Sequence, residues 1–180
     1  MFFSVQELEH RKILFDVSFP PGEIEFLDPS LSQASPLLAE GSAELLLNTL
    51  GEIRVQGGLK VTMEGTCDRC LEVARLPIES SFDLFYRPAE QVAKQHGGEE
   101  VKIDEGEAEI AFYEDGRLEL EDILREQILL SMPMQRICGE LCKGICLVCG
   151  QNRNVTNCTC QAKPADDRWA ALKTLHVRGI

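Results

Sequence analysis

The sequence predicts an α+β protein: a mainly antiparallel β body with a central helix, followed by a cysteine-rich C-terminal lobe. Several stretches in the first two thirds of the chain alternate apolar and polar residues with the period of two typical of half-buried strands. Residues 119–132 have the spacing of an amphipathic helix instead. Six of the eight cysteines follow that helix. We expect residues 1–133 to form the body and residues 134–180 the lobe with a last helix, together making one compact unit.

The N-terminal part of the chain is expected to contain strands and loops. Residues 14–19 are a short apolar run that ends at a Pro-Pro-Gly turn signal. Residues 27–40 are rich in serine and proline and are predicted to be loop. Residues 42–50 and 52–56 are candidate strands, and residues 57–58, a Gly-Gly pair, are predicted to form a tight turn after them.

The clearest strand pattern follows this pair. Leu59, Val61 and Met63 alternate with polar residues, and residues 74–86 form a second apolar stretch. Pro77 restricts the start of that stretch to a sheet edge or a bulge. A Cys-Asp-Arg-Cys segment lies between the two stretches, so we place it at the tip of a hairpin.

A polar, acidic segment and then a helix complete the body. Residues 87–107 have little to bury, so we expect a mobile loop there. Residues 109–113 are a candidate strand, and residues 115–116, Asp-Gly, are a turn signal. The helix that follows should end at residue 132, ahead of Pro133. Its apolar stripe, which we expect to pack in the core, consists of Leu120, Ile123, Leu124, Ile128 and Ser131.

A last helix is expected near the end of the chain. Asp166 can cap it, and Pro164 lies just before. Trp169, Leu172 and Leu175 fall on one side of that helix, which is consistent with docking on the body.

The formal net charge of −12 argues against tight binding to a nucleic-acid duplex, which normally uses a basic surface. The sequence has no apolar run long enough to span a bilayer and no recognisable secretory signal. We therefore predict a cytoplasmic protein of bacterial type that contacts no membrane. The one candidate basic surface is the C-terminal third, which carries Lys143, Arg153, Lys163, Arg168, Lys173 and Arg178; we favour the interpretation that these are ordinary solvated side chains.

The eight cysteines are predicted to bind two structural zinc ions, because closely spaced cysteines in a reducing compartment more often hold metal than disulfides. A Cys-x-x-Cys pair lets one tight turn present both sulfurs to an ion. Cys146 and Cys149 form such a pair, and Cys158 and Cys160 follow after a short loop, so these four can close a local site. The remaining four cysteines then form the other site, so that the two sites together use all eight. Cys138 and Cys142 have the spacing of one helical turn, which puts both sulfurs on one face, and they pair with Cys67 and Cys70 at the hairpin tip.

Catalytic alternatives fit less well. A redox Cys-x-x-Cys pair would need to start a helix in a βαβ setting, whereas Cys67 and Cys70 lie between apparent strands. The Cys142-x3-Cys146-x2-Cys149 spacing of a radical-SAM cluster would leave Cys138, Cys158 and Cys160 unexplained. The three histidines are scattered, and no HExxH, P-loop or GxSxG motif occurs. A saturated thiolate quartet leaves no open position for water. We therefore predict no enzyme, no catalytic or cofactor-binding residues, and no small-molecule substrate.

Five segments also match a known pattern: residues 67–71 (CDRCL), 124–133 (LREQILLSMP), 138–154 (C-x3-C-K-G-x-C-x2-C-G-Q-N-x-N), 158–160 (CTC) and 167–172 (DRW-x2-L). Together they resemble the YceD family, the large ribosomal RNA subunit accumulation proteins. The resemblance covers the chain from about residue 40. Ile145 and Leu147 depart from the expected Leu and Pro. The resemblance implies a cytoplasmic role in producing or stabilising the large-subunit ribosomal RNA, with frequent linkage to a large-subunit ribosomal protein gene, and implies no reaction.

Two functional hypotheses from different classes follow. The first is a non-enzymatic zinc-binding module that supports accumulation of large-subunit (23S) ribosomal RNA and ribosome biogenesis, through a ribosome-assembly protein or ribonucleoprotein and possibly through contact with ribosomal RNA itself. The second is a metal-dependent or thiol-based enzyme that acts on RNA or on a redox partner. Metal content and thiol reactivity discriminate between them.

Overall fold

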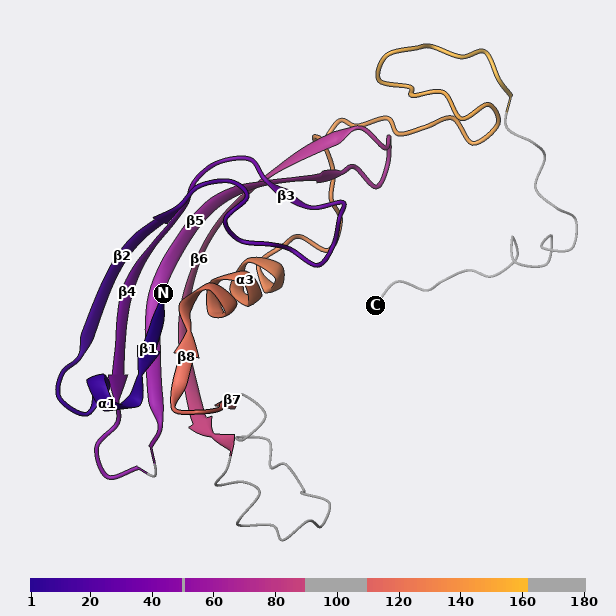
Figure 1. The fold of residues 1–180 in the computed structure, drawn as a ribbon. Coiled ribbons are helices and arrows are strands. Elements are labelled where there is room, and N and C mark those ends of the chain that lie inside the picture. The colour runs from indigo at the N-terminus through magenta and orange to yellow at the C-terminus, as the bar shows by residue number, and fades with distance from the viewer. Residues whose placement is uncertain (50, 90–109, 162–180) are drawn as a thin grey trace, which may run out of the picture.

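Six strands of this computed structural model form one curved, mainly antiparallel sheet (Figure 1). The structure describes residues 1–49, 51–89 and 110–161. Along the sheet the strand order is β2-β4-β5-β6-β7, and β3 also pairs with β5. Every pairing is antiparallel except that of β6 with β7, which is parallel. The strands are β2 (Ile13–Phe19), β3 (Ser32–Gln33), β4 (Leu37–Leu45), β5 (Ile53–Thr66), β6 (Val73–Pro88) and β7 (Ile110–Tyr113).

The long β5–β6 hairpin dominates the sheet and places its tip far from the strand ends that hold β7. Its alternation is as predicted: Val61 and Met63 of β5 are buried, and so are Leu76 and Ile78 of β6. β7 pairs only with the last four residues of β6. Pro77 therefore lies where β6 has no second partner strand among the described residues, which confirms its edge position.

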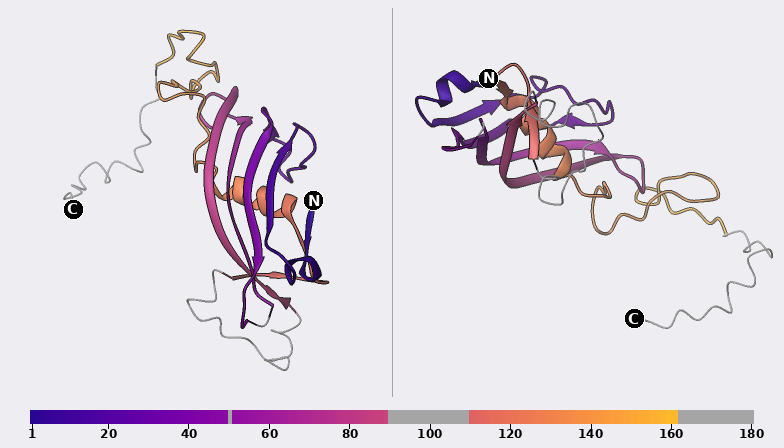
Figure 2. Two further views of the ribbon diagram at one scale, coloured as in Figure 1. Left: turned by 90° about the vertical axis from the view of Figure 1, so that its left-hand side faces the viewer. Right: turned by 90° about the horizontal axis from the view of Figure 1, so that it is seen from below.

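One helix, α3 (Leu120–Leu130), covers the buried face of the sheet (Figures 1 and 2). The predicted apolar stripe is confirmed at four positions, and Ser131 is the C-cap. A tight turn at Asp115 and Gly116 precedes the helix, with φ of 53° and 64°, as in the type I′ turn that Asp-Gly favours. The turn joins β7 to β8 (Arg117–Glu119). The buried residues of α3 are Leu120, Ile123, Leu124 and Ile128.

The N-terminus adds two short elements that the sequence did not predict. β1 (Phe2–Ser4) pairs with β8, and α1 (Val5–Leu8) follows directly. The Ser4 hydroxyl caps α1 by accepting the N–H of Glu7 at 3.2 Å. Elements of three or four residues are too short to show a period, so only their packing fixes them. Phe3 of β1 is fully buried in the core.

Two predictions about the β4–β5 region were wrong. Residues 57–58 are not a turn but lie inside β5, and residues 37–40 belong to β4 rather than to a loop. Gly57 is required for a different reason: a Cβ there would lie 2.4 Å from the Glu40 carbonyl oxygen. Glycine in a strand often marks such a close backbone approach. From the sequence alone, a glycine needed for close approach of two strands cannot be distinguished from a glycine in a turn.

Two other predictions, the acidic loop and the C-terminal helix, concern residues that lie mainly outside the described part of the chain. Residues 87–88 of the expected acidic loop belong to β6, and its residues 90–107 lie outside the described part of the chain, as does the expected C-terminal helix. Within residues 1–49, 51–89 and 110–161, no helix has the length and apolar character needed to cross a membrane.

Candidate metal centres

The tip of the β5–β6 hairpin is a knuckle that turns two sulfurs in one direction. The N–H of Leu71 donates to the Cys67 carbonyl at 2.9 Å, and the N–H of Cys67 donates to the Glu72 carbonyl at 2.8 Å. Leu71 has a φ of 65°. This left-handed residue closes the turn, so that Cys67 and Cys70 both lie in the buried core.

Two reciprocal hydrogen bonds bring the segment after α3 to this tip. The Asp68 N–H donates to the Arg136 carbonyl, and the Asp68 carboxylate accepts the Arg136 N–H, both at 2.7 Å. Cys138 and Cys142 follow. Their predicted helical turn was wrong: a backbone turn joins them instead, with the Cys142 N–H donating to the Gly139 carbonyl at 3.1 Å.

The first quartet, Cys67, Cys70, Cys138 and Cys142, has the geometry of a tetrathiolate site. The Sγ atoms of Cys67 and Cys142 are 3.9 Å apart, those of Cys70 and Cys138 are 3.5 Å apart, and all four lie within 4.8 Å of one another. Four thiolates in a tetrahedron about 2.3 Å from Zn²⁺ lie about 3.8 Å from each other. The donor set therefore fits a zinc ion, and all four cysteines are free thiols.

Hydrogen bonds prepare one sulfur of this quartet to bind as a thiolate. Burial alone would raise the pKa of the Cys67 thiol, but backbone N–H groups outweigh burial and lower that pKa to about 6. The N–H groups belong to Cys70, Arg69 and Cys138, the last at 3.3 Å from the sulfur. Because metals bind the thiolate, the lowered pKa suits Cys67 to act as a ligand near neutral pH.

The second quartet repeats the knuckle. The Gly150 N–H donates to the Cys146 carbonyl and the Cys146 N–H donates to the Gln151 carbonyl, both at 2.8 Å, with a Gly150 φ of 73°. Gly150 thus occupies the left-handed position that Leu71 occupies in the first knuckle. Backbone N–H groups of the knuckle again lower the pKa of the first sulfur, that of Cys146, to about 6. The four sulfurs, all within 4.8 Å of one another, belong to Cys146, Cys149, Cys158 and Cys160.

The two quartets differ in burial. Cys67 and Cys70 belong to the main core, and Cys142 packs against it. In the second quartet only Cys146 is buried, at 8% exposure, while Cys149 and Cys160 are exposed. This quartet lies in a lobe beyond the hairpin tip, residues 143–161, which we call the distal lobe (Figures 1 and 2). The first quartet therefore joins the core to the distal lobe.

The structure gathers the eight sulfurs into the same two groups that the sequence predicted; metal binding itself stays a prediction. Sequence reasoning missed the side chains that place the sulfurs. Asp68 lies within the CDRCL segment and Asn154 within the Gln-Asn-x-Asn segment, but neither spacing indicates a contact. Such contacts depend on chain segments that meet only after folding.

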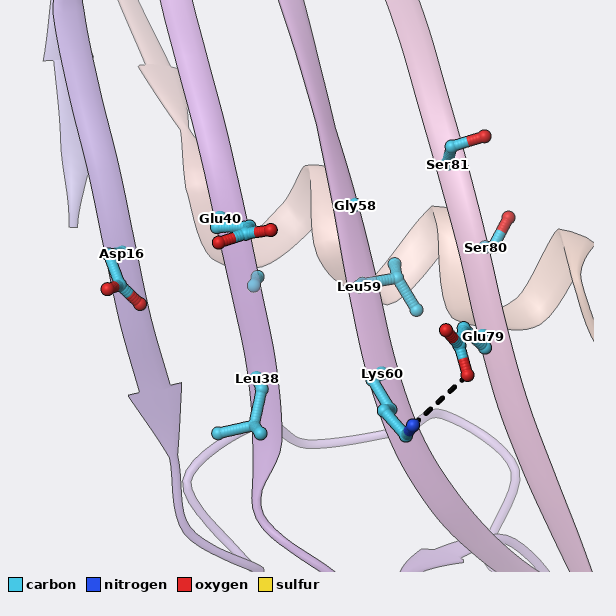
Figure 3. Close-up of a pocket in the computed structure, with 10 residues that line it drawn as sticks. Asp16, Leu38, Glu40, Gly58, Leu59, Lys60, Glu79, Ser80 and Ser81 are labelled. Atoms are coloured by element: carbon cyan, nitrogen blue, oxygen red, sulfur yellow. Dashed lines mark ion pairs between the residues drawn. The ribbon is translucent and has the colours of Figure 1, made fainter.

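A shallow hollow lies on the other face of the sheet (Figure 3). It lies over Gly58, which has no side chain to fill it. The carboxylates of Asp16 and Glu40 and an ion pair between Lys60 and Glu79, 3.1 Å long, surround it. All four charged residues are solvent-exposed, and the lining contains no histidine or cysteine. These are ordinary side chains of a solvated sheet face, so we assign no chemistry to the hollow.

The fold and these sites define a class: an α+β protein with two four-cysteine centres suited to metal. Comparison with known proteins identifies the family. The model of the family described as "Large ribosomal RNA subunit accumulation protein YceD" matches residues 55–176, a span that includes all eight cysteines, and the chain belongs to this family. The resemblance seen in the sequence is thereby confirmed.

Two plant proteins share this similarity. The chain is 27% identical over 133 residues to the chloroplastic YCED homolog 1 of Zea mays, covering 63% of this chain and 45% of the relative. It is 27% identical over 142 residues to the corresponding Arabidopsis thaliana protein, covering 69% and 44%. The chain thus spans less than half the length of either relative. No solved structure matches it.

Proposed function

We propose that this chain is a non-enzymatic, zinc-binding protein that supports accumulation of large-subunit (23S) ribosomal RNA. One observation carries the proposal: two sets of four thiols, each spaced for a tetrahedral ion, occur in a member of the YceD family. Four thiolates saturate a tetrahedral zinc ion, whereas catalytic zinc keeps one position open for water or substrate. Thiolate donors also favour zinc over magnesium, calcium or manganese.

In this proposal the ions serve as cross-links. Cys67, Cys70, Cys138 and Cys142 would hold one ion and fasten the hairpin tip to the chain that leaves α3. Cys146, Cys149, Cys158 and Cys160 would hold the other and organise the distal lobe. That lobe buries almost no large apolar side chain, so metal binding must offset the entropy of ordering it.

The surface around the knuckles supports a protein or ribonucleoprotein partner. Large apolar side chains next to the metal-binding cysteines are exposed: Leu71 is 64%, Leu141 92% and Leu147 98% accessible. A contiguous exposed apolar patch is typical of a protein interaction site, so these leucines are candidate contact residues for a partner. The net charge of −12 opposes binding that depends on phosphate contacts. We place the protein where ribosomes assemble, in a bacterial-type cytoplasm.

The test has a cellular and a biochemical part. Deleting the gene should lower the ratio of large-subunit to small-subunit ribosomal RNA, and the wild-type chain should restore it, whereas Cys67→Ser/Cys70→Ser should not. Capture from lysate with and without ribonuclease separates a protein partner from direct RNA contact. The purified chain should hold two zinc ions and show no reactive thiol. An unchanged ribosomal RNA ratio in the deletion would refute the function, and one zinc with several reactive thiols would favour a thiol-based or metal-dependent enzyme.

A further inference from the structure

The distal lobe contacts the first quartet directly. Gly144 lies against Arg69 in the first knuckle, so closely that a Cβ on Gly144 would be 2.9 Å from the Arg69 carbonyl oxygen. Three hydrogen bonds cross from the lobe to the first site: Ile145 N–H to the Arg69 carbonyl at 2.9 Å, Asn152 Nδ2 to Glu72 Oε1 at 3.3 Å, and Asn154 Nδ2 to Cys142 Sγ at 3.4 Å. The last of these reaches a sulfur of the first quartet.

The loop of the second quartet fixes Asn154 in place. Its N–H donates to Asn152 Oδ1 at 2.9 Å, and its Oδ1 accepts the Lys143 N–H at 2.8 Å. With the amide oxygen so engaged, its Nδ2 donates toward Cys142 Sγ. Asn152 and Asn154 both lie in the short loop between Cys149 and Cys158, which the second quartet closes. The side chain that reaches the first quartet therefore belongs to the loop that connects the two cysteine pairs of the second quartet.

We propose that Asn154 is a positioning residue for the metal of the first quartet, and that it couples the two sites, so that filling the second strengthens binding at the first. The inference rests on the proposed metal binding. Four thiolates around Zn²⁺ leave a net charge of −2, and an N–H donor directed at a sulfur stabilises that charge. Such outer partners are typically worth about 10- to 100-fold in metal affinity. Because coupling between binding sites is reciprocal, the first metal also strengthens the second site.

The decisive variant is Asn154→Asp. It retains the oxygen that accepts the Lys143 N–H but removes the N–H donor to Cys142 and adds a negative charge. Asn157→Asp is the matched control: the same substitution in the same loop, at an asparagine whose side chain makes no hydrogen bond to any described residue. The control reports the effect of one added negative charge in the same loop, away from the contact with Cys142.

Two measurements read the first site. Zinc affinity is determined by competition with a chromogenic chelator, and ¹¹³Cd NMR of the cadmium-loaded chain should give one resonance for each quartet. The first-site resonance is the one that Cys67→Ser abolishes. Asn154→Asp should weaken the first site about 10- to 100-fold and shift that resonance while leaving the second in place. Asn157→Asp should do neither.

A double-mutant cycle tests the coupling. Cys146→Ser/Cys149→Ser, which removes the second site, should weaken the first by a similar factor, and adding Asn154→Asp should then have little further effect. An unchanged first-site affinity and resonance in Asn154→Asp, or additive losses in the cycle, would overturn the coupling while leaving metal binding intact. A wild-type chain that holds no metal would instead overturn the proposed zinc function on which the inference rests.

Discussion

Gly144 is where the distal lobe meets the first knuckle, so Gly144→Ala should loosen that contact. Its φ is 68°, and alanine in this left-handed conformation costs about 1–2 kcal/mol. The new Cβ would also lie 2.9 Å from the Arg69 carbonyl oxygen, which is backbone and yields only if the chain moves. That movement endangers the hydrogen bond from Ile145 to Arg69, worth about 1 kcal/mol. We expect a total loss of about 2–3 kcal/mol.

Gly150→Ala is the matched control, because Gly150 has a φ of 73° and no atom within 4 Å of its would-be Cβ. It carries the conformational cost without the overlap. Amide hydrogen exchange of the zinc-loaded chain reads the contact at the Ile145 N–H. The additional loss of about 1 kcal/mol in Gly144→Ala corresponds to about fivefold faster exchange there than in Gly150→Ala. Equal protection of Ile145 in the two variants would refute the docking argument.

Three further predictions follow from strand packing, knuckle geometry and metal content. Leu71→Gly should raise the free energy of unfolding of the zinc-loaded chain by about 0.5–1 kcal/mol in a urea titration. Glycine removes the strain of an exposed leucine in the left-handed conformation, and this gain exceeds the cost of the greater freedom of glycine in the unfolded chain. A lower free energy of unfolding would show that the leucine stabilises the fold. Gly57→Ala should destabilise the sheet by about 3 kcal/mol, since its Cβ would lie 2.4 Å from a carbonyl oxygen of β4. In the control Gly58→Ala, the nearest atom to the new Cβ is 3.7 Å away, and stability should change by less than about 0.5 kcal/mol. Equal melting temperatures of the two variants by circular dichroism would contradict this. Removal of metal with excess chelator should unfold the distal lobe while the strands of the sheet keep dispersed amide resonances, and dispersed lobe resonances without metal would show that the ion is not the organiser.

Local pattern was sufficient for several features of this protein. The alternation in β5 and β6, the stripe of α3 and the Asp-Gly turn before it all depend on residues close together in the chain, where side-chain period and backbone preference act directly. The cysteines were a special case. Short spacings identified the second quartet, and the requirement that four ligands complete each site assigned the distant remainder.

Contacts between distant segments decided the rest. Glycines 57 and 58 look like a turn in sequence, but the approach of β4 to β5 makes them strand residues. The chain after α3 reaches the hairpin tip through Asp68 and Arg136, 68 positions apart, a pairing that no spacing rule predicts. Likewise, Asn154 is one polar residue among several until folding directs its amide at Cys142. The sequence by itself determined which residues could ligate metal, because that is a matter of side-chain chemistry and short-range reach. Only the tertiary structure decided which residues hold the two quartets against each other, because those contacts exist only once the sheet has brought the segments together.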